Sequence, residues 1–263
     1  MTRTTPAPAV PPDVLRLTGH PVRWQLLSAL SGGDRQVREL SELVGQRQSL
    51  TSYHLGRLRN GGLVTMRRSS ADRRDTYYSL DLPACRDRIV RAGTALHPGL
   101  RLVPAEPPLL SSTSPVGGPP VRVLFLCTGN SARSQMAEAI AAQLGGAWIE
   151  AASAGSHPKA LHADAVRVMR ERGLDISGRR SKHLREFDGQ RFDHVISLCD
   201  RVREVCPEFT GSPALTHWSM PDPSGDDGGY PAFVRTADEL STRIPFLLAA
   251  VAHARSSTER SST

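Results

Sequence analysis

The chain has 263 residues, which is enough for two ordinary domains that each bury a hydrophobic core. Its formal net charge of +7 is unevenly placed, because residues 1–97 hold 15 arginines, no lysine and eight acidic residues, whereas the remainder is balanced. Only the first third is therefore expected to meet a polyanion. Four cysteines exclude a disulfide scaffold, and no apolar stretch suits a signal peptide or a membrane span, so we expect a cytoplasmic protein.

Composition divides the chain into five segments. Residues 1–13 and 98–120 are rich in proline, which predicts a disordered N-terminus and an extended linker. Residues 255–263 are short and polar, which predicts a disordered tail. Two globular domains remain, at 14–97 and 121–254.

The first domain is predicted to contain helices followed by a hairpin. Apolar residues at helical spacing predict three helices between residues 20 and 62, each ended by glycine. Two β-prone stretches within 63–82 enclose a polar tip, which predicts a hairpin, and a further helix is expected from about Leu82 to Leu96. A short helix, a tight turn at Gly45 and a longer polar helix are typical of a helix-turn-helix.

The longer helix of this motif would lie in the major groove of double-stranded DNA. Its first turns could contact base edges, while arginines further along and at the hairpin tip would contact phosphates. A solvated helix and loop with surplus arginine is the alternative. The expected DNA contacts are Arg47, Gln48, Ser49, Ser52, Tyr53 and Arg57 on the helix and Arg67, Arg68, Arg73 and Arg74 at the hairpin.

The stretch from His20-Pro21-Val22-Arg23 through RELSELVGQRQSLTSYHLGRLRNGGLV to YYSL resembles the ArsR family of winged-helix repressors. The resemblance covers residues 14–97 and implies a homodimer, paired through its first and last helices, that releases DNA when an effector binds. Arsenic-sensing members often carry a cysteine pair on the helix before the recognition helix, whereas that helix here is VRELSELVG. Cys85, the one thiol of this domain, is either an arsenite contact across the dimer axis or a small buried apolar residue.

The second domain alternates strands with helices, which predicts an α/β fold with a parallel sheet and helices on both faces. The expected strands are 121–127, 147–155, 193–199 and 214–219, and the expected helices are 131–145, 162–173 and about 230–254.

The most specific motif in the chain is VRVLFLCTGNSARS. A buried strand ends at Cys127, and Arg133 follows six residues later at a helix start. The loop amides and the helix N-terminus carry partial positive charge, Arg133 can bind two oxygens of a tetrahedral oxyanion, and the same field favours a nucleophilic thiolate at Cys127. A core cysteine beside a helix arginine is the alternative. The expected oxyanion-binding residues are Thr128, Gly129, Asn130, Ser131, Ala132, Arg133 and Ser134.

Three further residues are expected to support this loop. Asn130 can hydrogen-bond the loop carbonyls and so hold their amides inward, and the Ser134 hydroxyl can donate to the Cys127 thiolate. Asp222 lies between two prolines, which stiffen the backbone and suit a carboxylate that exchanges protons above a fixed anion. A plain surface turn is the alternative for Asp222.

Residues 121–254 resemble the low-molecular-weight tyrosine phosphatases in the CTGNSARS loop, SAGSHP, GLDISGRRSKHL and PDPS. The resemblance implies that Cys127 is the nucleophile, that Arg133 binds the oxyanion and that Asp222 is the acid and base. This fold hosts both phosphate-ester hydrolysis and arsenate reduction, and the fold cannot choose between them.

A spaced cysteine pair, Cys199 and Cys206, resembles the pair of the thioredoxin-coupled arsenate reductases. The implied cycle passes from Cys127 to Cys199 and then to Cys206, and it needs no bound cofactor or metal, only an external thioredoxin-like or low-molecular-weight thiol. Two unrelated cysteines are the alternative. A helix across this segment would hold the Cα atoms roughly 10 Å apart, beyond the about 4.4–6.8 Å of a disulfide, so the pair requires a loop or unwinding.

The leading hypothesis is a bifunctional transcriptional regulator and arsenate reductase. The alternatives for the second domain are an oxyanion or redox sensor in a transcription factor, or a working phosphatase. A sensor would not need Asp222, whereas a phosphatase would need neither Cys199 nor Cys206.

Overall fold

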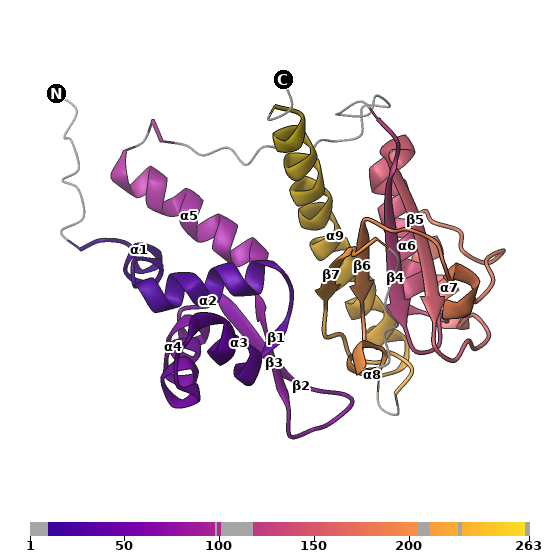
Figure 1. Cartoon of the computed structure of the whole chain (residues 1–263), viewed down its shortest axis with the longest axis horizontal. Helices are drawn as coiled ribbons and strands as arrows, with labels where there is room; N and C mark the ends of the chain where they lie inside the picture. Colours follow the sequence, from indigo (N-terminus) through magenta and orange to yellow (C-terminus); the bar gives the residue numbers. More distant parts are fainter. Residues whose placement is uncertain (1–9, 98, 101–117, 205–210, 226–227, 261–263) are drawn as a thin grey trace. The chain divides into compact units, whose positions relative to one another are not determined.

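The computed structural model describes residues 10–97, 99–100, 118–204, 211–225 and 228–260. The chain forms two compact units, one made mainly of residues 1–105 and the other mainly of residues 106–263 (Figure 1). Most of the expected linker, 98–120, lies outside the described residues, as do residues 1–9.

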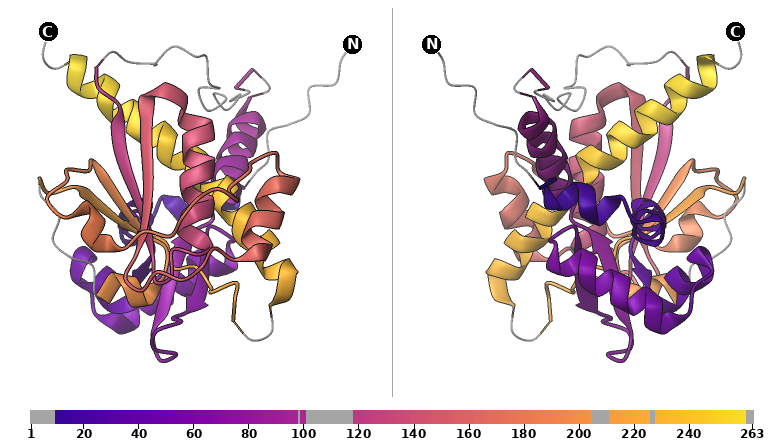
Figure 2. Two further views of the ribbon diagram at one scale, coloured as in Figure 1. Left: turned by 90° about the vertical axis from the view of Figure 1, so that its right-hand side faces the viewer. Right: turned by 90° about the vertical axis from the view of Figure 1, so that its left-hand side faces the viewer.

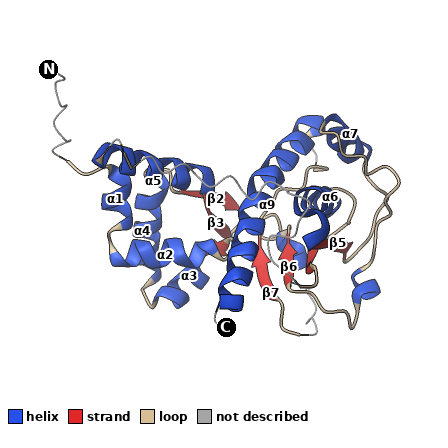
Figure 3. Cartoon of the chain, turned by 90° about the horizontal axis from the view of Figure 1, so that it is seen from above, coloured by secondary structure: helices blue, strands red, loops and turns tan. Residues whose placement is uncertain are grey.

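The first unit contains the expected helices and hairpin (Figure 3). Its strands form one antiparallel sheet in the order β1–β3–β2, in which Val64 pairs with Leu80 and Arg68 with Thr76. The helices are α1 (Asp13–Thr18), α2 (Pro21–Ser31), α3 (Val37–Val44), α4 (Gln48–Asn60) and α5 (Leu82–Leu96), and the strands are β1 (Arg35–Gln36), β2 (Val64–Arg68) and β3 (Thr76–Leu80).

The turn between α3 and α4 depends on Gly45, whose φ of 63° lies in the left-handed region that glycine adopts without steric cost. Helix α4 then buries Thr51, His54, Leu55 and Leu58. Leu50, another apolar residue of this helix, does not share this face, and its side chain is 40% exposed. Each helical residue is rotated by about 100° from the one before, which places Leu50 outside the buried stripe.

Two short elements of the first unit escaped the sequence analysis. Helix α1 begins at Asp13, directly after the prolines, and buries only Val14. Strand β1 has two residues, which pair with Tyr77 and Tyr78 of β3. Elements this short lack a full hydrophobic period, so periodicity cannot detect them.

The second unit is built on a parallel four-stranded sheet in the order β5–β4–β6–β7. Helix α6 packs on β4 and β5, and α9 packs against α6 and α7 (Figures 1 and 2). The strands are β4 (Val121–Cys127), β5 (Ile149–Gly155), β6 (His194–Ser197) and β7 (Ala214–His217), and the helices are α6 (Arg133–Gly145), α7 (Ala163–Glu171), α8 (Asp200–Glu204) and α9 (Gly229–Arg260), with 3₁₀ turns η1 (Gly146–Trp148) and η2 (Leu184–Phe187).

Strand β4 is the first strand of the sheet in the chain and lies between β5 and β6. Its residues Val123 to Leu126 are fully buried, as the apolar run predicts for a central parallel strand. The chain leaves β4 toward β5 on one side and later returns to β6 on the other. In open α/β sheets such a switch point opens a crevice at the carboxyl end of the strand, and β4 ends there at Cys127.

The expectation of a disordered tail at 255–263 is wrong for residues 255–260, because α9 continues to Arg260. The hydroxyls of Ser256 and Ser257 donate to the carbonyls of Ala252 and His253 at 3.0 Å, one helical turn earlier. Polar composition alone does not end a helix that is anchored upstream, where Leu248 and Val251 are buried.

None of the helices in the described part of the chain combines the length and apolar character that a bilayer crossing requires. The same residues contain no cluster of three or more histidine, cysteine, aspartate or glutamate side chains that could hold a metal ion.

Candidate active site

A pocket lies at the carboxyl end of β4, where the loop 128–132 connects the strand to α6. The structure brings together Cys127, Arg133, Cys199 and Asp222, which come from four separate segments of the sequence. Cys206, the fifth expected catalytic residue, lies outside the described residues. The pocket is lined by Cys127, Thr128, Gly129, Ser131, Ala132, Arg133, Lys159, Cys199, Arg201, Asp222, Ser224 and Gly225.

The sulfur of Cys127 is surrounded by hydrogen-bond donors. The backbone N–H of Asn130 donates to Sγ at 3.2 Å, and Oγ of Ser134 lies 3.0 Å from the same sulfur. The Asn130 side-chain amide donates to Ser134 Oγ at 2.8 Å, so the Ser134 hydroxyl hydrogen can point at the sulfur. The Asn130 N–H and the Ser134 hydroxyl are thus both placed within hydrogen-bond distance of the sulfur.

The loop carbonyls are bound from outside the loop, and not by the Asn130 side chain as we expected. Segments 157–162 and 179–182 provide the donors. These bonds fix the peptide groups of the loop, whose Asn130 N–H is directed at Cys127 Sγ. The four bonds are His157 N–H to Thr128 O at 2.8 Å, Lys159 N–H to Gly129 O at 2.8 Å, Ser181 Oγ to Asn130 O at 2.8 Å and His162 N–H to Ser131 O at 2.9 Å.

Gly155, the last residue of β5, lies directly against this loop. A Cβ atom at this position would be 2.6 Å from Thr128 O and 2.8 Å from Asn130 N. Both distances are far below a normal contact and involve backbone atoms. Glycine is therefore required here so that the strand can approach the loop.

The Asn130 side chain organises the interior behind the loop. Its φ of 44° is uncommon for a residue other than glycine and is best tolerated by asparagine. Its amide nitrogen donates to Ser134 and Ser153, and its oxygen accepts from Gln135 Nε2 at 3.0 Å and from the Lys182 N–H at 2.7 Å. All four hydrogen-bonding positions of the amide are thereby used.

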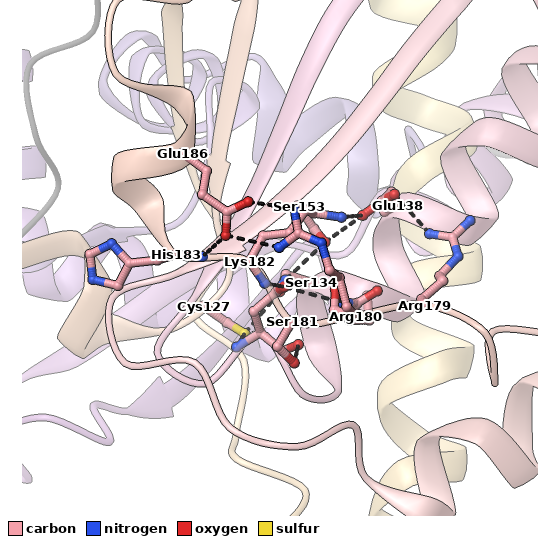
Figure 4. Close-up of polar contacts among 12 residues, drawn as sticks. Cys127, Ser134, Glu138, Ser153, Arg179, Arg180, Ser181, Lys182, His183 and Glu186 are labelled. Carbon is pink, nitrogen blue, oxygen red and sulfur yellow. Dashed lines mark hydrogen bonds and ion pairs between the residues drawn. The ribbon is translucent and has the colours of Figure 1, made fainter.

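A half-buried ion-pair cluster continues this network away from the pocket (Figure 4). Ser153 donates to Glu138, whose carboxylate lies 3.0 Å from both Lys182 Nζ and an Arg179 nitrogen. Only 14% of the Glu138 side chain is exposed. A chain of polar contacts thus links Cys127 and Ser134 to charged residues that fix the loop's rear face.

Arg133 and Asp222 face each other across the pocket. One Arg133 nitrogen donates to Met220 O at 3.0 Å, and the other lies 3.1 Å from Asp222 Oδ2. Burial raises the pKa of the Asp222 carboxyl, but the positive charge of Arg133 and hydrogen bonds from Ser224 outweigh it, so the pKa is lowered overall. Asp222 is therefore ionised at neutral pH while it contacts Arg133.

Cys199 lies at the pocket wall, with its Sγ 3.3 Å from Thr128 Oγ1. Burial raises the pKa of this thiol, and the positive charge of Arg133 opposes the shift only in part. Helix α8 begins at the next residue. Five of the six positions between Cys199 and Cys206 are thus helical, whereas a disulfide between these two cysteines requires a loop or an unwound segment here.

Sequence reasoning missed the residues that support the loop from a distance. Lys159 and Arg201 line the pocket, and Glu138, Ser153 and Lys182 form the cluster behind it. SAGSHP and GLDISGRRSKHL resemble the phosphatase family, but their positions in the sequence do not indicate which of their atoms contact the loop.

The expected DNA-contacting residues are on the surface of the first unit. Tyr53 on α4 is 59% exposed, Arg67 is half-buried, and the others are exposed. Cys85 lies in the first turn of α5, half-buried, with its thiol 3.5 Å from Leu63 O. Burial and the nearby Asp81 raise the pKa of Cys85, which disfavours the thiolate.

Comparison with known proteins matches both units. Residues 122–257 match the sequence model of the low molecular weight phosphotyrosine protein phosphatases, and residues 20–66 match that of bacterial regulatory proteins of the arsR family. An arsenate reductase of Brevibacillus brevis is 40% identical over 123 residues, 46% of this chain and 90% of the relative. A glutaredoxin arsenate reductase of Synechocystis sp. is 34% identical over 130 residues, 49% of this chain and 98% of the relative. A solved structure of an arsenate reductase in its oxidized state has 33% identity and a TM-score of 0.45, covering 49% of this chain and 98% of its own.

Proposed function

Because the chain belongs to the low molecular weight phosphotyrosine protein phosphatase family, we propose that its second unit is an arsenate reductase joined to a DNA-binding regulator of the arsR type. The curated relatives described above support reduction over hydrolysis, since both are arsenate reductases and the chain covers at least 90% of each.

The observation that carries the proposal is the second thiol in the pocket. Cys199 lies beside Thr128 of the phosphate loop and lines the same pocket as Cys127. Hydrolysis requires one nucleophile, whereas reduction requires a source of two electrons. A second cysteine at the pocket wall provides that source.

In the first step, the Cys127 thiolate attacks arsenic, and one arsenate oxygen leaves as water. Arg133 and the inward-facing loop amides bind the remaining oxygens, and Asp222 supplies a proton to the departing oxygen. The incoming anion takes the place of the Asp222 carboxylate at Arg133. Without its Arg133 partner, Asp222 has a higher pKa, which makes it a better proton donor.

In the second step, the Cys199 thiolate attacks Cys127 Sγ. The sulfur–arsenic bond breaks, its electron pair remains on arsenic, and arsenite leaves behind a 127–199 disulfide. Cys206 then attacks Cys199, which frees Cys127 and forms a 199–206 disulfide. An external thiol, either thioredoxin-like, glutaredoxin-like or of low molecular weight, reduces that disulfide.

The first unit is proposed to bind double-stranded DNA as a homodimer, with α4 in the major groove and the β2–β3 hairpin along the backbone. The exposed polar residues of α4 and the arginines of the hairpin support this role. The half-buried position of Cys85 and its raised pKa favour a packing role over an arsenite contact.

Cysteine substitutions in the full chain test the reductase proposal. Cys127→Ser should abolish both arsenate reduction and any hydrolysis of a phenyl phosphate. Cys199→Ser and Cys206→Ser should each stop multiple turnover with a thiol reductant and leave hydrolysis intact. If both variants turn over arsenate at the parent rate, the relay is wrong; if only hydrolysis occurs in the parent protein, the second unit is a phosphatase.

A further inference from the structure

A buried polar cluster lies behind Cys199 and has no part in the relay proposed above. It consists of Ser197, Asp200, His217 and Ser219, hereafter the Asp200 cluster, and each member is less than 9% exposed. Ser219 Oγ donates to Asp200 Oδ1 at 2.6 Å, and His217 Nε2 lies 3.1 Å from the same oxygen. His217 Nδ1 lies 2.8 Å from Ser197 Oγ.

The partners fix the orientation of the His217 ring. An ionised carboxylate can only accept, so Nε2 carries the hydrogen and donates to Asp200. In the neutral ring, Nδ1 then accepts from the Ser197 hydroxyl. The cluster is a continuous set of hydrogen bonds from Ser197 at the end of β6, through β7, to Asp200.

These bonds tie the first turn of α8 to the sheet. Asp200 is the first residue of α8, and the Cys199 carbonyl accepts from the Arg203 N–H at 3.3 Å, so Cys199 caps the helix. Ser197 and His217 are direct partners in the parallel pairing of β6 and β7. With its neighbour anchored in this way, Cys199 is held where its sulfur meets Thr128 in the pocket.

The relay requires two different positions of Cys199. The Cys199 sulfur must first attack Cys127. The same sulfur must then be attacked by Cys206, which lies seven residues further along the chain. Helix α8 occupies Asp200–Glu204 of this interval. A helix continued to Cys206 would hold the two Cα atoms roughly 10 Å apart, beyond the about 6.8 Å limit of a disulfide, and release of the start of α8 would remove this restriction.

We propose that the Asp200 cluster is a positioning device that holds Cys199 toward Cys127 for the first exchange and retards the second. This inference rests on the proposed arsenate reductase function. In the second exchange the Cys206 thiolate attacks Cys199 Sγ, the 127–199 disulfide breaks, and Cys127 leaves as a thiolate. No outside electrons are needed for this step, so its rate can be followed without an external reductant.

The experiment compares Asp200→Ala with Asp200→Asn in the full chain. Alanine removes both carboxylate oxygens, whereas asparagine keeps an Oδ1 atom for Ser219 and His217 at nearly the same volume and replaces only Oδ2, which accepts from the Ser70 N–H at 2.6 Å. The reduced protein is mixed with one equivalent of arsenate, quenched in acid at intervals and alkylated, and mass spectrometry follows the 127–199 and 199–206 disulfides. Hydrolysis of a phenyl phosphate by the same samples reports whether the phosphate loop is intact.

We expect Asp200→Ala to form the 127–199 disulfide more slowly and to convert it to the 199–206 disulfide faster, on the order of fivefold for the second rate, because the tie to β7 is removed. Asp200→Asn should keep both rates and the hydrolysis close to the parent values. This opposite change in two successive rates is not produced by general destabilisation, which would lower both together with hydrolysis.

Ser219→Ala decides the question if Asp200→Ala also loses hydrolysis, because it removes one hydroxyl and leaves the carboxylate with His217. Like Asp200→Ala, Ser219→Ala should shorten the lifetime of the 127–199 disulfide. An unchanged lifetime in Ser219→Ala and Asp200→Ala, or equal behaviour of Asp200→Ala and Asp200→Asn, overturns the inference. Absence of both disulfides in the parent protein would instead refute the relay itself.

Discussion

At the residue scale, the reactive sulfur depends on partners that carry no reactivity of their own. Asn130 bonds to Ser134 and Ser153, and Gly155 allows β5 to approach the loop. The side chains proposed to touch the substrate are those of Cys127, Arg133 and Asp222, together with the backbone amides of the loop. The others reduce the freedom of these three side chains and of the loop amides, which is the usual requirement for pre-organised oxyanion binding.

We expect phosphate to raise the pKa of Asp222. In the free protein Arg133 helps to hold this pKa below its usual value, and a bound anion replaces the carboxylate at Arg133 and adds negative charge nearby. A ¹³C NMR titration of the carboxyl groups, with Asp222→Asn to identify the resonance, measures the shift. An unchanged pKa in saturating phosphate would show that the anion does not displace this contact.

The same lowered pKa makes the fold sensitive to acid. The folded-state pKa lies below the unfolded value of about 3.9, so the Asp222 contacts stabilise the fold above that value. This contribution disappears as the pH falls through the folded pKa. Asp222→Asn should therefore reduce the dependence of stability on pH only in this acidic range, which urea unfolding at a series of pH values measures.

Gly155→Ala should weaken catalysis without unfolding the protein. The added Cβ meets Thr128 O and Asn130 N, and the loop must shift to relieve the clash. We expect kcat/KM for a phenyl phosphate to fall at least tenfold, which corresponds to about 1.4 kcal/mol of transition-state stabilisation. Gly178→Ala is the matched control, since nothing lies within 4 Å of its Cβ position. Equal activity of the two variants would contradict the close approach of β5.

At the scale of elements, α4 and the β2–β3 hairpin are proposed to contact DNA in different ways. Gln48 lies in the first turn of α4, where a side chain can reach base edges, whereas Arg73 and Arg74 are exposed between β2 and β3. Contacts to bases give sequence preference, and contacts to phosphates give affinity that depends on salt.

Replacing Arg73 and Arg74 by alanine should lower affinity on all DNA sequences. The slope of log K against log salt should become less steep by about 0.9 for each phosphate that the protein no longer neutralises. Fluorescence anisotropy across a salt series measures this slope. Arg170→Ala with Arg185→Ala removes the same charge from exposed positions of the second unit, and a matching decrease in affinity there would show that net charge alone is responsible.

Gln48→Ala should instead change which sequences are preferred. Removal of a base contact typically costs about 1–3 kcal/mol on the preferred site and little elsewhere. Competition between the preferred operator and variants with single base changes measures the effect. A uniform decrease in affinity across all sites would place Gln48 among the phosphate contacts.

At the scale of the whole molecule, each unit has its own hydrophobic core. Leu26, Leu40, Leu55 and Leu58 centre the first, and the buried strand β4 with α6 and α9 centres the second. Neither core requires side chains of the other. Each of the two activities proposed for the chain should therefore be retained in a fragment that contains only its own unit.

We expect residues 118–263 alone to hydrolyse a phenyl phosphate at a rate close to that of the full chain, and residues 1–100 alone to bind DNA as a dimer. Circular dichroism and sedimentation of each fragment check that it folds and in which state. An unfolded or inactive second fragment would show that the units depend on each other, and a monomeric first fragment would exclude the expected dimer.

The sequence alone determined the parts of the protein that arise from short segments. Strand β4, the loop and the start of α6 are contiguous, so VRVLFLCTGNSARS specifies where Cys127 and Arg133 meet. The helices α2 to α4 follow from apolar spacing and glycine stops, and the confinement of the net positive charge to residues 1–97 follows from counting charged residues. Each depends on neighbours along the chain, which periodicity and local geometry capture.

Only the tertiary structure decided which distant groups complete the site. The donors that bind the loop carbonyls come from 157–162 and from Ser181, the support for Asn130 comes from Ser153 and Lys182, and Asp200 meets His217 across the sheet edge. The extension of α9 and the formation of α8 directly after Cys199 also came from the fold. These features depend on contacts between residues far apart in sequence, and a single sequence carries no local pattern for such pairs, because many spacings satisfy the same chemistry.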